Sequence, residues 1–415
     1  MSAPALELNI HGIAAGGDGV GRADGLVVFV PRSAPGDRVR VDVRRGKRLA
    51  RGTHLQVLTP SPDRVPPACV HYVRDRCGGC QLQHLGDAAQ RLAKATIIRD
   101  AFQRIARRPL AVPEVRHGPA AWRYRAKLTL ALRRSGAGWR AGLHRYDAPD
   151  EIFALEDCLI TDQRVMDAWR EILAHAGLLP RAESLRASVR LLGQGAALVV
   201  EGGTHWTQAD ALLAAVPVLT GVWWTPANEG ARRRLVASRG AGQEHGAAFT
   251  QVNATVAALM REHVLSLVRA RAPRTVVDAY SGVGDTAEPV ARAGATVVAI
   301  ELDREASQVC ARRLPAGSRA VTGRVERALP SALPAELVIL NPPRAGTTAA
   351  VTDALEQASP RPRCIIYVSC DPATLARDVA RLPSYTVASV VGFDMFPQTA
   401  HVETVCELAL QEAAT

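Results

Sequence analysis

The sequence is poor in lysine, and no apolar run in it is long enough to cross a membrane. Only three of the 51 basic residues are lysine, so arginine supplies almost all of the positive charge. The longest apolar stretch, 211–224, is broken by Pro217 and Gly221 and falls short of the roughly 20 residues that a membrane-spanning helix needs. The first residues also lack the basic and apolar segments of a signal peptide. These absences argue against membrane contact and predict a cytoplasmic protein.

Internal repeats and low-complexity tracts are also missing, whereas apolar residues and positive charge are plentiful. Of the 415 residues, 47% are hydrophobic, which excludes wholesale disorder, and the length predicts two or three domains. The net charge is +11, which favours a polyanion such as nucleic acid as the partner. A coding bias toward arginine explains the same excess, so charge alone leaves both interpretations open.

Residues 1–59 consist of short alternating runs separated by glycine, proline and aspartate turns, a pattern that predicts a small OB-like β-barrel. Basic residues crowd one predicted strand and its turn between Arg38 and Arg51, where such a barrel would face a nucleic-acid backbone. A solvated hairpin is the alternative. The proline-rich stretch 59–67 ends this domain.

Residues 60–246 have the mixed pattern of an α+β domain. The expected elements are a helix over 88–107 and strands over 122–132, 185–192 and 196–201, arranged as an antiparallel sheet. In the first of these strands Arg123, Arg125 and Lys127 alternate with apolar and aromatic residues, so one strand face would present three cations.

Residues 247–415 change to alternating helices and strands, which predicts a Rossmann-like, doubly wound parallel sheet. The expected elements are a helix over 254–270 and strands over 275–279, 296–301, 337–340, 364–369 and 387–392. The fold class is therefore α/β, with a small N-terminal barrel and a central α+β domain.

A glycine turn containing Gly282 and Gly284 follows the first of these strands, and Glu301 closes the next one. In an open α/β sheet such a turn lets a nucleotide-like ligand approach the backbone, and the acid can accept hydrogen bonds from ribose hydroxyls. Gly282, Gly284 and Ala287 also match the G-x-G-x-x-A pattern of dinucleotide-binding proteins. A dinucleotide-dependent oxidoreductase is therefore an alternative at this point.

Three further residues that can do chemistry follow later strands. Asn341, in Asn-Pro-Pro-Arg, places an amide at the edge where open α/β sheets bind ligands. Cys370, in Ser-Cys-Asp-Pro, can act as a nucleophile if its thiolate is stabilised. Glu403, in His-Val-Glu, can act as a general base if it lies near the same crevice.

Four of the eight cysteines, Cys69, Cys77, Cys80 and Cys158, are candidate metal ligands. Disulfides are rare in a reducing cytosol, so the clustering of three of these cysteines requires another reason. Four thiolates that include a C-x-x-C pair can hold either zinc or an iron–sulfur cluster, and the spacing leaves both open.

Taken together, these motifs resemble those of the RNA uracil-C5 methyltransferases of the TrmA/RlmD type, which are class I S-adenosylmethionine-dependent enzymes. The resemblance covers nearly the whole chain and rests on Phe-Thr-Gln-Val-Asn at 249–253, the glycine turn, Asn-Pro-Pro-Arg, Ser-Cys-Asp-Pro and His-Val-Glu. It implies a TRAM-type RNA-binding barrel over 1–59, a central RNA-binding domain with a cysteine cluster over 60–246, and a methyltransferase domain over 247–415.

The resemblance also implies roles for individual residues. Cys370 would add to C6 of uracil as the nucleophile, and Glu403 would be the base. The residues around S-adenosylmethionine would be Gln251, Tyr280, Gly282, Gly284, Glu301 and Asn341. The RNA would contact Phe249, Arg123, Arg125 and Lys127, and Cys69, Cys77, Cys80 and Cys158 would hold a [4Fe-4S] cluster, with zinc as the alternative. Asn341 stands where the family usually has aspartate.

The RNA target implied by the resemblance is ribosomal, because a shorter transfer-RNA form of the family lacks both barrel and cluster; transfer RNA is the alternative. An exocyclic-amine methyltransferase would need an aromatic residue at Arg344 and no nucleophile at Cys370. A non-enzymatic RNA-binding or assembly factor is disfavoured because nucleophile, base and ribose-binding acid are all present. We expect a monomer without an obligate protein partner.

Overall fold

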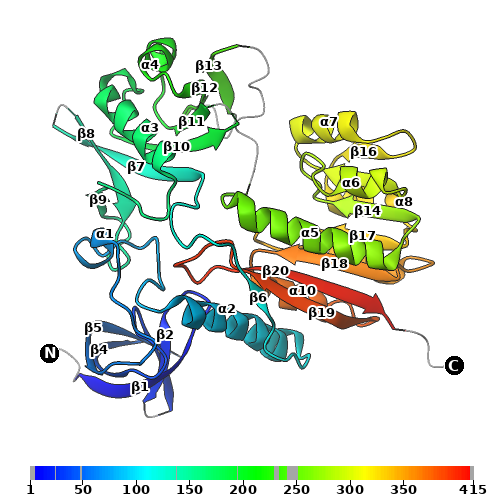
Figure 1. Ribbon diagram of the computed structural model, residues 1–415, viewed down its shortest axis with the longest axis horizontal. Helices are drawn as coiled ribbons and strands as arrows, with labels where there is room; N and C mark the ends of the chain where they lie inside the picture. The colour runs from blue at the N-terminus through cyan, green and yellow to red at the C-terminus, as the bar shows by residue number, and fades with distance from the viewer. Residues whose placement is uncertain are drawn as a thin grey trace.

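The protein has three parts, which Figure 1 shows as a small barrel, a mixed sheet and a larger sheet with helices on both faces. The computed structural model describes residues 5–23, 25–46, 49–136, 138–193, 195–228, 233–240 and 251–411. This arrangement confirms the predicted fold class. None of the helices in these ranges is both long and apolar enough to span a membrane.

The N-terminal barrel closes in the strand order β1-β2-β3-β5-β4, with β3 and β5 parallel and the other pairs antiparallel. Its strands are β1 (Leu6–Ile13), β2 (Gly19–Ala23), β3 (Leu26–Val30), β4 (Arg38–Arg45) and β5 (Ala50–Thr59). Alternation along these strands directs small apolar side chains such as Val28 and Val39 into the barrel core. Of the basic residues expected to face nucleic acid, Arg38 forms an ion pair with Glu7, and positions 47 and 48 lie outside the described residues.

The central part is a seven-stranded sheet in the order β13-β12-β11-β10-β7-β8-β9. Its elements are β7 (Lys127–Ser135), β8 (Gly138–His144), β9 (Ile152–Ala154), α3 (Gln163–Ala174), η2 (Ala176–Leu178), β10 (Ser184–Leu192), β11 (Gly195–Glu201), α4 (Ala209–Ala215), β12 (Leu219–Thr225) and β13 (Arg234–Ser238). The expected antiparallel pairing holds except between β11 and β12, which are parallel because α4 carries the chain back across the sheet. Helices α3 and α4 bury the apolar side of this sheet.

The strand predicted over 122–132 begins later, at Lys127, so the expected cationic strand face does not form. Arg123 has a left-handed backbone with φ of 54°, which no strand residue adopts. Its guanidinium pairs with Asp157 at 2.6 Å and donates to the carbonyl of Cys158 at 3.1 Å. Arg125 donates to the Lys127 carbonyl. The prediction that these three residues present one face is therefore wrong.

The C-terminal sheet has eight strands in the order β16-β15-β14-β17-β18-β20-β19-β6. The strands are β14 (Thr275–Ala279), β15 (Thr296–Glu301), β16 (Arg319–Thr322), β17 (Leu337–Leu340), β18 (Cys364–Ser369), β19 (Tyr385–Phe393) and β20 (Glu403–Leu410). The helices are α5 (Ala254–Arg271), α6 (Ala287–Arg292), α7 (Arg304–Arg313), α8 (Val325–Ala332), α9 (Ala349–Gln357) and α10 (Pro372–Ala380). The first five strands in this order are parallel, and β20 runs antiparallel to β18.

An early segment of the chain, 87–116, packs against the C-terminal sheet. The predicted domain boundary at residue 246 had assigned this segment to the central domain. Helix α2 (Asp87–Ala101) continues as a short π-helix (Phe102–Ala106), and Ile98 and Phe102 lie in the same apolar core as α10. Strand β6 (Val115–Arg116) pairs with β19 (Figure 1). A shorter helix, α1 (Val70–Val73), follows the first of the clustered cysteines.

Candidate active site

The candidate residues lie along one edge of the C-terminal sheet. Strands β14, β15, β17 and β18 are parallel neighbours, so the turns that follow them all meet at their carboxyl ends. The chain leaves β14 toward β15 and later returns to β17 on its other side, which makes the space between β14 and β17 the switch point of the sheet. Open α/β sheets bind ligands at such a point.

The turn after β14 has a left-handed backbone at three residues, two of which are glycine. Gly282 and Gly284 have φ of 56° and 87°, and Tyr280 between the strand and the turn has φ of 63°. A Cβ on Gly284 would lie 2.7 Å from the Cys310 sulfur, whereas one on Gly282 would enter open space. The turn therefore packs tightly at Gly284 and leaves room beside Gly282.

Glu301, at the end of β15, is tied to this turn by backbone hydrogen bonds. Its Oε2 accepts from the Gly282 N–H at 2.8 Å, and its Oε1 accepts from the Asp303 N–H at 2.8 Å. Each carboxylate oxygen keeps a second lone pair. The acid is thus oriented and can still accept hydrogen bonds from a pair of vicinal hydroxyls.

Asp278, the fourth residue of β14, is an acidic group at this edge to which the sequence pattern gave no role. It is 2% exposed, and burial raises its pKa to about 7. Its Oδ2 has no hydrogen-bond partner among the described residues. The only sequence signal for it is an acid at the end of an otherwise apolar strand.

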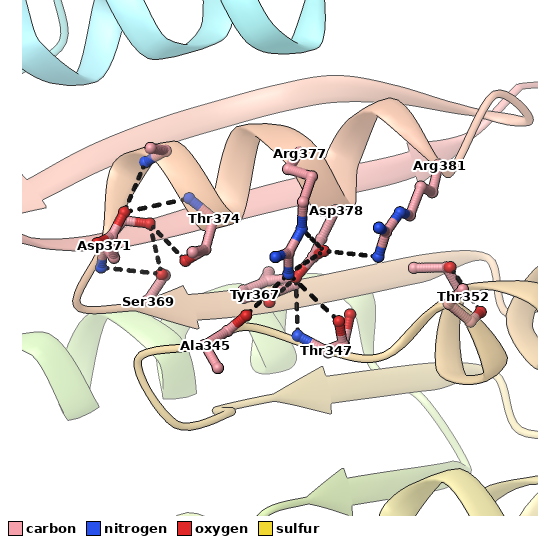
Figure 2. A network of polar contacts seen from close by, with 12 residues as sticks. Ala345, Thr347, Thr352, Tyr367, Ser369, Asp371, Thr374, Arg377, Asp378 and Arg381 are labelled. Carbon is pink, nitrogen blue, oxygen red and sulfur yellow. Dashed lines mark hydrogen bonds and ion pairs between the residues drawn. The ribbon is translucent and has the colours of Figure 1, made fainter.

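The loop that follows β17 contains Asn341, whose N–H donates to the Ala279 carbonyl at 3.2 Å and so ties this loop to the end of β14. Figure 2 shows how this loop is fixed to α10 through the buried Asp378. One Asp378 oxygen accepts from the Thr347 N–H at 2.8 Å and from the Tyr367 hydroxyl at 2.7 Å. Arg377 bridges the other oxygen and the Ala345 carbonyl.

Cys370 is half-buried in the turn between β18 and α10. Asp371 caps α10 by accepting from the Ala373 and Thr374 N–H groups, and Ser369 closes the turn by hydrogen bonds to the Asp371 backbone (Figure 2). Burial, followed by the negative charge of Glu403, raises the pKa of the Cys370 thiol, and the charge of Arg344 opposes this.

Glu403 lies close to Cys370. Strands β18 and β20 pair as far as Ser369 opposite Thr404, so Cys370 follows β18 at the end where β20 begins with Glu403. Glu403 is 4% exposed, and burial raises its pKa to about 7. A carboxyl group with that pKa can accept and release a proton near neutral pH, as a general base must. Strand β20 begins at Glu403, so His401 lies before the strand.

The connection between β19 and β20, residues 394–402, is almost completely buried and is held by segments from far along the chain. Lys94 of α2 forms a buried ion pair with Asp394. The Asn253 side chain donates to the Met395 carbonyl at 3.3 Å, and the Tyr124 hydroxyl donates to the Pro397 carbonyl at 3.0 Å. These bonds bring the half-buried Gln251 segment toward this loop, while Phe249 lies outside the described residues.

Cys69, Cys77, Cys80 and Cys158 line one cavity of about 100 Å³ between α1 and the central sheet. The Gly79 N–H donates to the Cys77 sulfur at 3.4 Å. The neighbouring thiols and burial raise the pKa of Cys80 to about 12, with burial the larger cause. Among the described residues, however, no three His, Cys, Asp or Glu side chains are arranged to ligate a single metal ion.

Part of the chain matches a known family. Residues 328–411 match the family described as tRNA (uracil-5-)-methyltransferase. The matched segment contains Asn341, Cys370 and Glu403, and excludes the glycine turn and the four clustered cysteines.

Several relatives are similar over nearly the whole chain. An uncharacterized RNA methyltransferase of Thermosynechococcus vestitus is 34% identical and aligns with 97% of this chain and 97% of that protein. The 23S rRNA (uracil(1939)-C(5))-methyltransferase RlmD of Aromatoleum aromaticum is 32% identical, with 94% of this chain and 96% of that protein covered. The enzyme of the same name from Bordetella avium is 30% identical over 93% of this chain and 87% of that protein.

Among solved structures, the tRNA (uracil-54, C5)-methyltransferase of Pyrococcus abyssi, in complex with S-adenosyl-L-homocysteine, has the same fold. The TM-score is 0.73, with 97% of this chain and 100% of that chain covered at 23% identity. The similarity therefore extends over the barrel, the central sheet and the C-terminal sheet.

Proposed function

Because the chain belongs to the family of RNA uracil-C5 methyltransferases, we propose that it methylates C5 of a uridine in 23S ribosomal RNA through a covalent bond to Cys370. S-adenosylmethionine-dependent methylation of RNA uracil is the activity of the family. The ribosomal target is supported by relatives of 30% and 32% identity that are named as 23S rRNA enzymes. The transfer-RNA enzyme of the same fold is only 23% identical.

Cys370 follows the end of β18 at which β20 begins with Glu403, and this proximity is the observation that carries the covalent mechanism. C5 of uracil is a weak carbon nucleophile. The Cys370 thiol first gives its proton to water, and the thiolate then adds to C6. The electron pair of the C5–C6 double bond moves into an enolate and enriches C5. C5 then attacks the methyl carbon of the sulfonium, and S-adenosylhomocysteine leaves with the electron pair of the broken bond.

Glu403 then completes the reaction in this proposal. The C5 proton moves to its carboxylate, the C5–C6 double bond forms again, and the Cys370 thiolate leaves C6. Burial gives Glu403 a pKa of about 7, so the carboxyl group exchanges protons with little driving force in either direction. The target uridine must flip out of its base stack to reach Cys370, because C6 of a stacked base is not accessible to a half-buried thiol.

The turn between β14 and β15 fits S-adenosylmethionine, which supplies the methyl group. The space beside Gly282 admits a ligand close to the backbone, and Glu301 is oriented to accept hydrogen bonds from the ribose hydroxyls. Asn341 adds a neutral amide beside the same turn. Tyr280 and Gln251 complete the proposed set.

For the four-cysteine cavity we propose a [4Fe-4S] cluster. The support is that all four thiols line one cavity of about 100 Å³. Hydrogen bonds to the sulfurs help to set the reduction potential of such clusters, and the Gly79 N–H bond to the Cys77 sulfur would supply one. Cys69, Cys77, Cys80 and Cys158 would hold the cluster, which would join the α1 segment to the loop at Cys158 and support RNA binding.

Nucleoside mass spectrometry of RNA from a deletion strain tests the proposed function. We expect 5-methyluridine to disappear from one site of 23S rRNA, to return with the wild-type gene, and to stay absent with Cys370→Ala. Loss from transfer RNA alone would overturn the ribosomal target. Retention of every 5-methyluridine would overturn the function itself.

A further inference from the structure

The loop that follows β17 folds into a tight turn with Arg344 near its tip. The Gly346 N–H donates to the Pro343 carbonyl at 2.8 Å, which closes a β-turn with Arg344 and Ala345 in its centre. The side chain of Arg344 is 70% exposed, so packing does not fix where it points. Its position therefore depends on the backbone of the turn.

Arg344 lies beside the turn that contains Cys370. Its Nε is 3.7 Å from Oδ2 of Asp371, the residue that follows Cys370, while Oδ1 of Asp371 caps α10. Burial and the charges of Glu403 and Asp371 raise the pKa of the Cys370 thiol, and the charge of Arg344 lowers it. A cation next to a cysteine favours the thiolate, which is the form that adds to carbon.

The end of this turn is fixed to α10 by the buried carboxylate of Asp378. Its Oδ2 accepts from the Thr347 N–H at 2.8 Å (Figure 2). Gly346 allows this approach, because a Cβ there would lie 2.5 Å from the same oxygen. A buried N–H that loses its acceptor costs free energy, so the place of the turn on α10 depends on Asp378.

Two arginines of α10 pair with the other oxygen of Asp378. Arg377 and Arg381 lie 2.8 Å and 3.4 Å from Oδ1, and their side chains are 39% and 38% exposed. Arg377 also donates to the Ala345 carbonyl at 2.9 Å and to the Thr347 carbonyl at 3.3 Å. Among the residues drawn in Figure 2, Arg381 contacts Asp378 alone, so the two arginines differ in their hold on the loop.

We propose that Asp378 and Arg377 are positioning residues for the methyl-transfer site. They hold the turn on α10 so that the Arg344 guanidinium stays beside the Cys370 sulfur. This inference rests on the proposed function, in which Cys370 is the nucleophile.

Arg377→Gln and Arg381→Gln are a matched pair of variants for this proposal. Each removes one cation from the same buried carboxylate at nearly the same exposure, but Arg377→Gln also releases the loop carbonyls. Thermal unfolding checks that both proteins are folded. The measurement is the rate at which iodoacetamide alkylates Cys370 in the complete protein without RNA, followed on its peptide by mass spectrometry from about pH 6 to 10.

The pH midpoint of this rate reports the ionisation of the thiol, because iodoacetamide reacts with the thiolate. We expect Arg344→Gln to raise the midpoint by about 0.5 in pH, which slows alkylation about threefold at pH 7. Arg377→Gln should cause most of this shift, and Arg381→Gln should cause none.

Asp378→Asn should also raise the midpoint. The loss of a negative charge would by itself favour the thiolate and lower the midpoint. A rise therefore reports the release of the turn, and a fall or no change would remove Asp378 from the positioning role.

A double variant shows whether Arg377 acts through Arg344. Adding Arg377→Gln to Arg344→Gln should not raise the midpoint further, because the guanidinium that Arg377 positions is already absent. Additive shifts, an equal shift in Arg381→Gln, or no shift in Arg377→Gln would overturn the proposal.

Cofactor binding and methylation separate this proposal from the proposed function. S-adenosylmethionine affinity should be unchanged in Arg377→Gln, because the hydrogen bond from the Asn341 N–H to the Ala279 carbonyl holds the other end of the loop. A fall in this affinity as large as the fall in alkylation rate would overturn the local role of Arg377. If alkylation shifts as expected but the wild-type protein methylates no RNA, the proposed function fails and the positioning role stands.

Discussion

Replacing Glu403 by glutamine tests how much the buried, ionised carboxyl group destabilises the folded protein. Glu403 is 4% exposed, and burial raises its pKa from 4.5 to about 7. A raised pKa means that the folded state prefers the protonated form. The contribution of Glu403 to stability is therefore complete below pH 4.5 and is lost as the pH rises through about 7.

The size of this loss follows from the shift. A change from 4.5 to about 7 corresponds to roughly 3 kcal/mol, which the ionised side chain costs the folded protein at pH 8. Glutamine has nearly the same shape and carries no charge. Glu403→Gln should therefore raise the free energy of unfolding by up to about 3 kcal/mol at pH 8, and by almost nothing near pH 4.5.

Hydrogen exchange of the β18 and β20 amides measures this effect, because it reports the opening free energy of this sheet separately from the rest of the chain. Glu407→Gln is the matched control. Glu407 is also buried on β20, but it pairs with Arg271 at 2.7 Å, so its replacement should destabilise the sheet. A Glu403→Gln variant that is no more stable than wild type at pH 8 would refute the reasoning.

Three further changes test other parts of the structure. Gly284→Ala should destabilise the protein by more than Gly294→Ala, which has a similar positive φ but open space at Cβ, and equal losses in thermal unfolding would contradict the close packing of the turn. Lys94→Met should cost about 3 to 5 kcal/mol by leaving Asp394 buried without its partner, whereas adding Asp394→Leu should recover much of this; urea unfolding that shows no recovery would contradict the role of the ion pair. Cys80→Ser should lower the iron content and the absorbance near 400 nm of anaerobically purified protein, and full iron content would remove this cysteine from the cluster.

Four of the five parallel strands of the C-terminal sheet could be predicted from the sequence almost to the residue, whereas β16 was missed. Their apolar runs are short and end at polar or glycine residues, and the bounds of β14, β15, β17 and β18 agree with the expected ranges. The order of the turns along the chain then placed Gly282, Asn341 and Cys370 at one edge, because parallel strands share a carboxyl end.

Other features depend on contacts that local patterns do not encode. Alternation at Arg123 looked like a strand, but the residue takes a left-handed conformation and binds the loop at Cys158, 35 residues later. Likewise, the π-helix that extends α2 and the pairing of β6 with β19 arise from packing against the last sheet. The ion pair between Lys94 and Asp394 joins residues that are 300 positions apart, so no local sequence pattern predicts it.

Trapping the protein on RNA that carries 5-fluorouridine tests the central claim most directly. Fluorine at C5 cannot be removed as a proton, so the reaction should stop after methyl transfer, with Cys370 still bonded to C6. After digestion, mass spectrometry should find a peptide containing Cys370 that carries a methylated fluorouridine, and omission of S-adenosylmethionine should prevent the methylated form. A modified peptide containing any other cysteine, or turnover of natural RNA without a trapped adduct on fluorinated RNA, would contradict the account.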